Sequence, residues 1–228
     1  MLSHGHYDHT GGAAQVIRRR PEIEVYFHPG AVQPRYSIRN GASRSIGMPR
    51  EAKTALNGLP ARGVHWVIRS TLIAPDVGVT GPIPRETPYE DVGGPFFLDP
   101  TGARRDPVDD DQALWINTPE GLVVCVGCCH AGLVNTLNHV ARLNDDAPIR
   151  AFIGGFHLGE ASDERLDRTI EALRAISPRM LAPCHCTGEK AIHAFKRVFG
   201  DMVSPGHAGT ACTTGIVPQG THRRWRGL

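Results

Sequence analysis

Three segments in the second half of the chain share one order of residue types. In each, a short apolar run typical of a buried strand ends at a small residue or a proline, a histidine follows, and a helix-like segment comes next. Strands that alternate with helices form layered α/β sheets whose strand ends lie along one edge, so this order predicts that the three histidines lie near one another. The strands, histidines and helices are residues 122–127, His130 and 133–143; residues 149–153, His157 and 163–176; and residues 179–182, His185 and 188–199.

A dense group of metal-ligating side chains lies at the start of the chain. His4, His6, Asp8 and His9 fall within six positions. Imidazole and carboxylate groups are good ligands for a borderline divalent metal. If His4 and His6 lie on extended chain, their spacing of two directs both imidazoles to one side, where they can share one ion. Asp8 and His9, where the chain turns toward a helix, can then face a second ion.

Length and composition are those of an ordinary globular protein. With 228 residues, 40% of them hydrophobic, the chain is expected to form a single domain over residues 1–228. A net charge of +2 provides no field that would attract a polyanion, so no nucleic-acid partner is expected, and the basic segment 222–226 is interpreted as a solvated tail. The chain has neither a long apolar run nor a signal-like start, which predicts no membrane association and a cytoplasmic location.

The six cysteines include the neighbours Cys128 and Cys129 and the close pair Cys184 and Cys186. Their number is too small, for a chain of this length, to form the dense disulfide framework of a small secreted domain. The paired spacing of a structural zinc finger is absent from the sequence as well. Reduced thiols are therefore expected.

The first half of the chain is less regular. A helix is expected over residues 12–20, a strand over 24–27, and an antiparallel pair over 112–116 and 121–126. Between them, residues 30–60 and 78–111 are rich in Gly, Pro and polar residues and are expected to be irregular insertions or lid segments, apart from a helix over 50–56. The first of these segments carries arginines that suit an anionic substrate, although a solvated face explains the same charges: Arg35, Arg39, Arg44 and Arg50.

The opening pattern His-x-His-x-Asp-His, with Thr-Gly-Gly behind it, resembles the signature of the metallo-β-lactamase superfamily. Within that superfamily the chain is similar to the branch of 7,8-dihydropterin-6-yl-methyl-4-(β-D-ribofuranosyl)aminobenzene 5′-phosphate synthases. The resemblance extends over most of the chain, in residues 2–12, 26–29, 110–114, 121–124, 127–132, 153–158 and 183–188.

This resemblance implies an α/β (α+β) fold, the αββα sandwich, with a dinuclear metal site at the edge between the two sheets. Members of the superfamily carry strands before the histidine motif, whereas here the motif begins at His4. The chain is therefore expected to be truncated at its N-terminus relative to the family.

The resemblance also implies a ligand set for two divalent ions, with Zn²⁺ favoured by nitrogen-rich ligation and Mn²⁺ or Fe²⁺ as alternatives. Many members place a bridging aspartate at a strand end, where this chain offers Cys128, Cys129 or His157. Which of these ligates a metal is left open. The expected ligands are His4, His6 and His130 for one ion, and Asp8, His9 and His185 for the other.

The chemistry implied is that of a metal-dependent hydrolase acting through a metal-bound hydroxide on a small phosphorylated or heterocyclic metabolite. Asp8 would orient the nucleophile, and His157 would protonate a leaving group or hold the substrate. A condensation that releases pyrophosphate is the alternative within the family, and a metal-binding protein without turnover is the alternative outside enzymes. A small-molecule substrate is expected, and homo-oligomerisation is left open.

Overall fold

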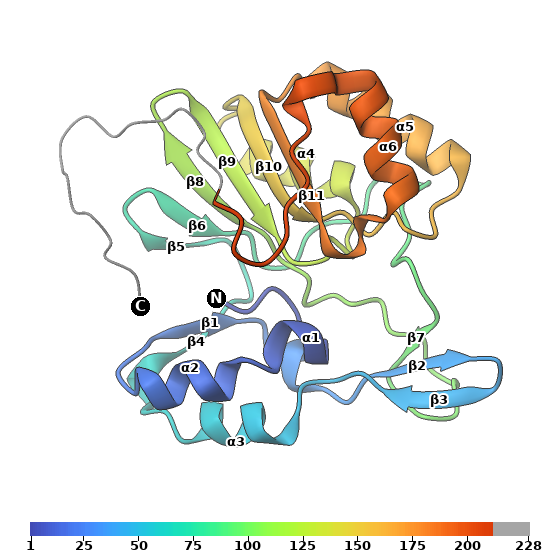
Figure 1. The fold of residues 1–228 in the computed structure, drawn as a ribbon. Helices are drawn as coiled ribbons and strands as arrows, with labels where there is room; N and C mark the ends of the chain where they lie inside the picture. The colour runs from blue at the N-terminus through green and yellow to red at the C-terminus, as the bar shows by residue number, and fades with distance from the viewer. Residues whose placement is uncertain (212–228) are drawn as a thin grey trace.

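Two β-sheets face each other, and each carries helices on its outer side (Figure 1). The computed structural model describes residues 1–211. The larger sheet has the strand order β11-β10-β9-β8-β6-β5, in which β9, β10 and β11 run parallel and the remaining neighbours are antiparallel. Its strands are β5 (Thr71–Ala74), β6 (Val77–Val79), β8 (Leu114–Thr118), β9 (Gly121–Val126), β10 (Ile149–Gly155) and β11 (Met180–Cys184).

Three helices cover the outer face of this sheet: α4 (Leu133–Leu143), α5 (Asp163–Ile176) and α6 (Glu189–Phe199). Their apolar side chains meet those of β9 and β10 in the main hydrophobic core, where Leu137, Phe152 and Phe195 are almost fully buried. Burying one such side chain stabilises the fold by roughly 1.5–3 kcal/mol. The alternation of strands and helices predicted from the sequence is thus confirmed. Strands β9, β10 and β11 are parallel because the helix after each of the first two returns the chain to the end of the sheet where the strand began.

The second layer consists of the parallel strands β1 (Val25–Phe27) and β4 (Val64–Trp66) with the helices α2 (Ala13–Arg19) and α3 (Arg50–Asn57). A separate apolar cluster holds it together and includes Phe27, Ala52 and Leu56. Ala52 and Leu56 are four positions apart and therefore face the same side of α3. The helix over 12–20, the strand over 24–27 and the helix over 50–56 all occur close to their expected positions. Short 3₁₀ turns, Pro29–Val32 and Ala61–Gly63, complete the connections.

Part of the segment 30–60 is more regular than expected. Strands β2 (Tyr36–Arg39) and β3 (Ala42–Ser45) form a hairpin, and β2 also pairs with β7 (Phe96–Phe97). Asn40 and Gly41 both have positive φ values, 51° and 76°, which is the geometry of a tight two-residue hairpin turn. The expectation of an irregular insertion is wrong for this stretch, whereas residues 78–111 are mostly loop, as predicted.

The start of the chain is held by backbone and side-chain hydrogen bonds. Leu2 N–H donates to Tyr26 O at 2.9 Å, and Gln112 N–H donates to Ser3 O at 3.1 Å. The Gln112 side-chain amide also donates to Leu2 O at 2.9 Å. Gly127 allows this close approach, because a Cβ atom there would lie 2.1 Å from Ser3 Oγ. The loop that carries the first histidines is therefore fixed between β1 and the end of β9.

A buried ion pair also holds the N-terminal loop that carries the first histidines. The Arg35 guanidinium, 2% exposed, lies 2.6 Å from Asp110 Oδ1 and 3.1 Å from Asp106 Oδ2. The other oxygen of Asp110 accepts a hydrogen bond from Gly5 N–H at 2.7 Å. Arg35 is thus a structural residue, and neither of the two alternatives considered for it, an anionic substrate or a solvated face, applies.

Among residues 1–211, no helix combines the length and apolar character needed to cross a membrane. The basic segment 222–226 lies outside the described residues.

Asp111 makes the stability of the metal-free protein depend on pH. Its carboxyl is buried and accepts a hydrogen bond from Ala131 N–H, and burial raises its pKa to about 7. Because the folded-state pKa lies above the unfolded value of about 3.9, the contribution to stability is complete below pH ~4 and is lost as pH rises to about 7. In the wild type, the free energy of unfolding should fall by on the order of 2–4 kcal/mol across this pH range. Asp111→Asn keeps the accepting oxygen but cannot ionise, so this fall should be absent from the variant.

Urea unfolding at several pH values between about 4 and 8 measures this effect. Asp167→Asn, at an exposed position of α5, is the control and should follow the wild-type curve. A pH profile of Asp111→Asn that matches the wild type would show that this carboxyl titrates normally.

Candidate metal centre

Four segments that are far apart in the sequence meet at one edge of the larger sheet. The parallel strands β9, β10 and β11 end there, and His130, His157 and His185 follow their carboxyl ends. The N-terminal loop and the short helix α1 (Tyr7–Thr10) approach the same edge from the other layer (Figure 1). They contribute His4, His6, Asp8 and His9.

The first group of ligands consists of His4, His6 and His130, which are all buried. His4 Nε2 lies 3.0 Å from His6 Nδ1. The ring centroid of His130 lies 4.7 Å from that of His4 and 4.8 Å from that of His6. Burial lowers the pKa of all three imidazoles, that of His6 to about 3. The rings are therefore neutral at pH 7 and have lone pairs available for a metal.

The second group consists of Asp8, His9 and His185. His9 Nε2 and His185 Nε2 are 3.1 Å apart. Asp8 Oδ2 lies 3.2 Å from His185 Nε2 and 3.5 Å from His9 Nε2. The hydrogen bond from His185 lowers the pKa of the Asp8 carboxyl to about 2, so the carboxylate is ionised at neutral pH. Two imidazole nitrogens and a carboxylate oxygen thus converge on one point, which is a typical donor set for a divalent ion.

Sulfur atoms lie beside both groups. Cys128, which is buried, places its Sγ 3.0 Å from His9 Nε2. Cys186 is close to Cys128, and a hydrogen bond between their side chains lowers the pKa of the Cys186 thiol to about 4. Both are free thiols. Cys129 differs, because its Sγ faces α4 and lies 3.2 Å from Thr136 Oγ1. Of the two neighbouring cysteines, only Cys128 reaches the site.

Backbone carbonyls orient two of the histidines. His130 Nδ1 lies 2.9 Å from Val92 O and donates to it, and His157 Nε2 lies 3.0 Å from Gly93 O and does the same. Each ring therefore presents its other nitrogen as an acceptor, and neither His130 Nε2 nor His157 Nδ1 has a hydrogen-bond partner among residues 1–211. A buried acceptor without a partner costs roughly 1–3 kcal/mol unless a cation or donor binds it. The side chains present thus fit divalent metal ions.

The backbone is strained at the same place. Cys129, His157 and His185 have φ values of 59°, 47° and 51°, a region that residues other than glycine seldom occupy. Each of them lies in a segment that follows one of the three parallel strands. Strain of this kind persists where the surrounding packing fixes the backbone, and it is concentrated in functional sites.

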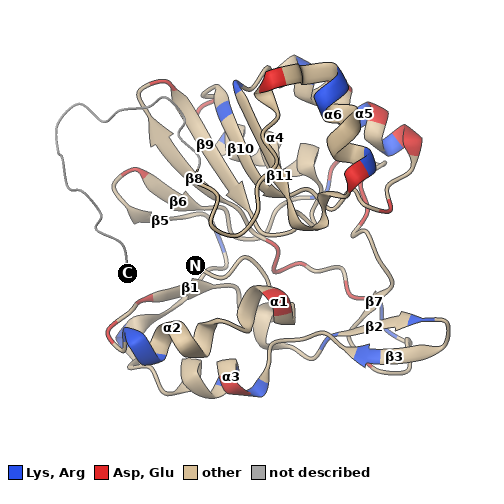
Figure 2. Ribbon diagram, viewed as in Figure 1, with Lys and Arg blue, Asp and Glu red and all other residues tan. Residues whose placement is uncertain are grey.

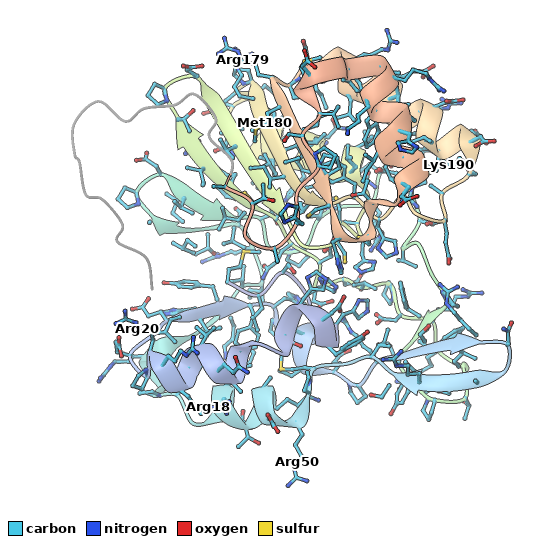
Figure 3. All side chains as sticks on the ribbon, viewed as in Figure 1. Arg18, Arg20, Arg50, Arg179, Met180 and Lys190 are labelled. Carbon is cyan, nitrogen blue, oxygen red and sulfur yellow. The ribbon has the colours of Figure 1, made fainter. Side chains whose placement is uncertain are left out.

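A cavity of about 500 Å³ opens over the two ligand groups. Its far wall is the β2–β3 hairpin, which carries Arg39 and Arg44 (blue positions on the hairpin in Figure 2). Phe96 of β7 completes it, with its ring centroid 5.0 Å from that of His6. Arg50 is exposed on α3 and points away from the hairpin and the cavity (Figure 3).

All seven site residues predicted from the sequence therefore lie at one location. Sequence reasoning did not find the residues that orient them, which are Arg35, Asp110, Val92, Gly93 and Phe96. Val92 and Gly93 act through backbone carbonyls, which carry no residue-type signal. Cys186 could have been found, because it directly follows His185.

The fold and the ligand groups together define a metal-binding αββα sandwich. The family model of the metallo-beta-lactamase superfamily matches residues 1–128, and the chain belongs to that superfamily.

Two proteins of one organism and one solved structure are similar to this chain over most of its length. The chain is 29% identical over 222 residues to the 7,8-dihydropterin-6-methyl-4-(beta-D-ribofuranosyl)-aminobenzene-5'-phosphate synthase of Methanocaldococcus jannaschii, covering 92% of this chain and 72% of that protein. It is 32% identical over 194 residues to an uncharacterized protein of the same organism, covering 84% of this chain and 70% of the relative. The crystal structure of Tm1679, a metal-dependent hydrolase of the beta-lactamase superfamily, matches with a TM-score of 0.77 and 32% identity over 92% of this chain and 76% of that one.

Proposed function

We propose that this protein is a metal-dependent hydrolase that acts on a small phosphorylated or heterocyclic metabolite. The observation that carries the proposal is the convergence of two ligand groups on one cavity of about 500 Å³. His4, His6 and His130 are proposed to hold one divalent ion, and Asp8, His9 and His185 the other. Nitrogen-rich ligation favours Zn²⁺, with Mn²⁺ or Fe²⁺ as alternatives. When bound, the ions would supply Lewis acidity that lowers the pKa of water and offsets charge on the attacked group.

Two side chains are proposed to take part in the reaction. Asp8 is ionised at neutral pH and lies on the cavity wall, so it can accept a hydrogen bond from water and orient it toward the substrate. His157 also lines the cavity, and its Nε2–H is already donated to Gly93 O. Its Nδ1 is therefore the nitrogen that can accept a hydrogen bond from the substrate, and in the protonated ring it can deliver a proton to a leaving group.

The hairpin suggests the charge of the substrate. Arg39 forms an ion pair with Glu160, with nitrogen–oxygen distances of 3.0 and 3.2 Å. Both side chains are more than half exposed, and such pairs contribute only about 0–1 kcal/mol. Arg39 can therefore turn from Glu160 to an anionic group in the cavity at little cost. Arg44, stacked over the Tyr7 ring at 5.4 Å, provides a second positive charge on the same wall.

Arg39→Ala is expected to raise KM for a phosphorylated substrate about tenfold with little change in kcat. The physical reason is that a hydrogen bond to a charged group is worth roughly 1.5–3 kcal/mol. Steady-state kinetics measure the effect, and Arg50→Ala, which removes an arginine outside the cavity, is the matched control. Equal KM values for Arg39→Ala and Arg50→Ala would show that Arg39 of the hairpin does not bind the substrate.

A second candidate function is a condensation in which a pterin diphosphate loses pyrophosphate. The 29% identity to the archaeal synthase favours it. The same cavity would then hold a diphosphate leaving group. A non-catalytic metal-binding protein is the candidate outside enzymes.

One experiment separates these candidates. Metal content of the purified protein is measured first, and then hydrolysis of a generic phosphodiester, a phosphomonoester and a lactone, together with pyrophosphate release from a pterin diphosphate. Bound metal and hydrolysis that His6→Ala abolishes support the hydrolase. Pyrophosphate release alone supports the condensation. His193→Ala, at an exposed position of α6, is the control and should retain wild-type activity. Activity that is indifferent to His6→Ala would contradict the proposal.

A further inference from the structure

The sulfur atom of Cys128 is shared by three groups of histidine and cysteine side chains that could hold a metal ion. Within each group the ligand atoms all lie within 4.8 Å of one another. The three groups draw on both histidine clusters and on the segment after β11, yet all contain the Sγ atom of Cys128. They are His4, Cys128 and His130; His9, Cys128 and His185; and Cys128, His157 and Cys186.

The position of Cys128 is fixed by its surroundings. The residue is 3% exposed, and it follows the carboxyl end of β9 after Gly127, the residue that allows the N-terminal loop to approach. Its Sγ lies between the two histidine groups, 3.0 Å from His9 Nε2. The next residue, Cys129, has its side chain on the opposite side of the chain against Thr136. Packing therefore directs one of two adjacent thiols into the site and the other into the core.

We propose that the Cys128 thiolate is a ligand shared by both metal ions and takes the place of a bridging carboxylate. This inference rests on the proposed dinuclear site. A thiolate sulfur has several lone pairs on one atom and can bind two ions at once, with Zn–S distances of about 2.3 Å. Thiolate is also a soft ligand, which selects Zn²⁺, Co²⁺ or Cd²⁺ over Mn²⁺ and Mg²⁺. The carboxylate of Asp8 then serves only the second ion.

The test uses the full chain, stripped of metal by a chelator and titrated with Co²⁺. Wild-type protein is expected to bind two equivalents and to show a thiolate-to-cobalt charge-transfer band in the near ultraviolet. Cys128→Ser should lose this band and bind cobalt about 10–100-fold more weakly. Cys128→Asp should restore two equivalents without the band and should accept Mn²⁺ better than the wild type does. Cys129→Ser, which keeps the hydrogen bond to Thr136, should behave as the wild type.

Failure of this inference can be told apart from failure of the proposed function. Two bound equivalents of Co²⁺ without a charge-transfer band, or a band that survives Cys128→Ser and disappears in Cys186→Ser, would overturn the shared thiolate and leave the dinuclear site intact. No Co²⁺ binding by the wild type would overturn both the shared thiolate and the dinuclear site on which the proposed function depends. Cadmium NMR of the wild type needs no variant: both cadmium resonances should couple to the β-protons of Cys128. Coupling of only one resonance contradicts the bridge.

Discussion

Replacing Asp110 by alanine is expected to lower the free energy of unfolding by about 3–5 kcal/mol, because removing one partner of a buried ion pair leaves the other charge uncompensated. Arg35 would remain 2% exposed with Asp106 as its only anionic partner among the described residues. Gly5 N–H, which donates to Asp110 at 2.7 Å, would lose its acceptor as well. The histidine loop should therefore loosen together with the fold.

Chemical denaturation at pH 7 measures this loss. Asp109→Ala removes the neighbouring carboxylate, which is exposed, and it should leave stability within about 0.5 kcal/mol of the wild type. Asp110→Asn retains an oxygen for Gly5 and should fall between the two. Equal midpoints for Asp110→Ala and Asp109→Ala would show that the ion pair contributes nothing.

Asp8→Asn is expected to reduce kcat/KM by about 10²–10⁴, the range typical of a side chain that positions or moves a proton in the transition state. The substitution keeps the shape of the side chain and removes its charge. His185, whose pKa is raised by its hydrogen bond to Asp8, would lose the negative charge of the partner that lies 3.2 Å away. The variant should therefore orient water less well and bind the second metal ion more weakly.

Kinetics on the substrate identified by the assay panel, with metal content measured on the same samples, test this prediction. Asp145→Asn, in the exposed loop after α4, is the control. Full activity of Asp8→Asn at unchanged metal content would exclude a role for this carboxylate. Lower activity that tracks metal loss alone would assign Asp8 to ligation rather than to orientation of water.

The sequence was sufficient to predict the features that follow from local pattern. Three strand–histidine–helix units and the helices over 12–20 and 50–56 occur where expected. The spacing of apolar residues within each segment is enough to predict whether it forms a helix or a strand. The clustering of His130, His157 and His185 followed from a general property of parallel strands, whose carboxyl ends share one edge.

The hairpin shows where the interpretation of the sequence failed. Residues 30–60 are predicted to be irregular apart from one helix, yet the Asn40-Gly41 pair within them is a strong signal for a two-residue hairpin turn. The flanking strands lack apolar alternation, since β3 is exposed throughout. Turn chemistry alone could have identified this element.

Arg35 shows a different limit. Its charge suggested an anionic ligand, but its partners Asp106 and Asp110 lie more than 70 positions away in the sequence. Nothing in the residues around Arg35 indicates burial, because that depends on how two distant loops pack. Pairing of this kind becomes visible only in three dimensions.

The ligands of the proposed centre extend from position 4 to position 185, and this separation has a consequence for synthesis of the protein. A ribosome releases the first histidines early, at roughly 5–20 residues per second, and the last strand emerges many seconds later. Until β11 has docked beside β10, His185 is absent from the second group. A nascent chain that lacks β11 would therefore lack one ligand of the second proposed ion, and loading of that ion would follow the docking of β11.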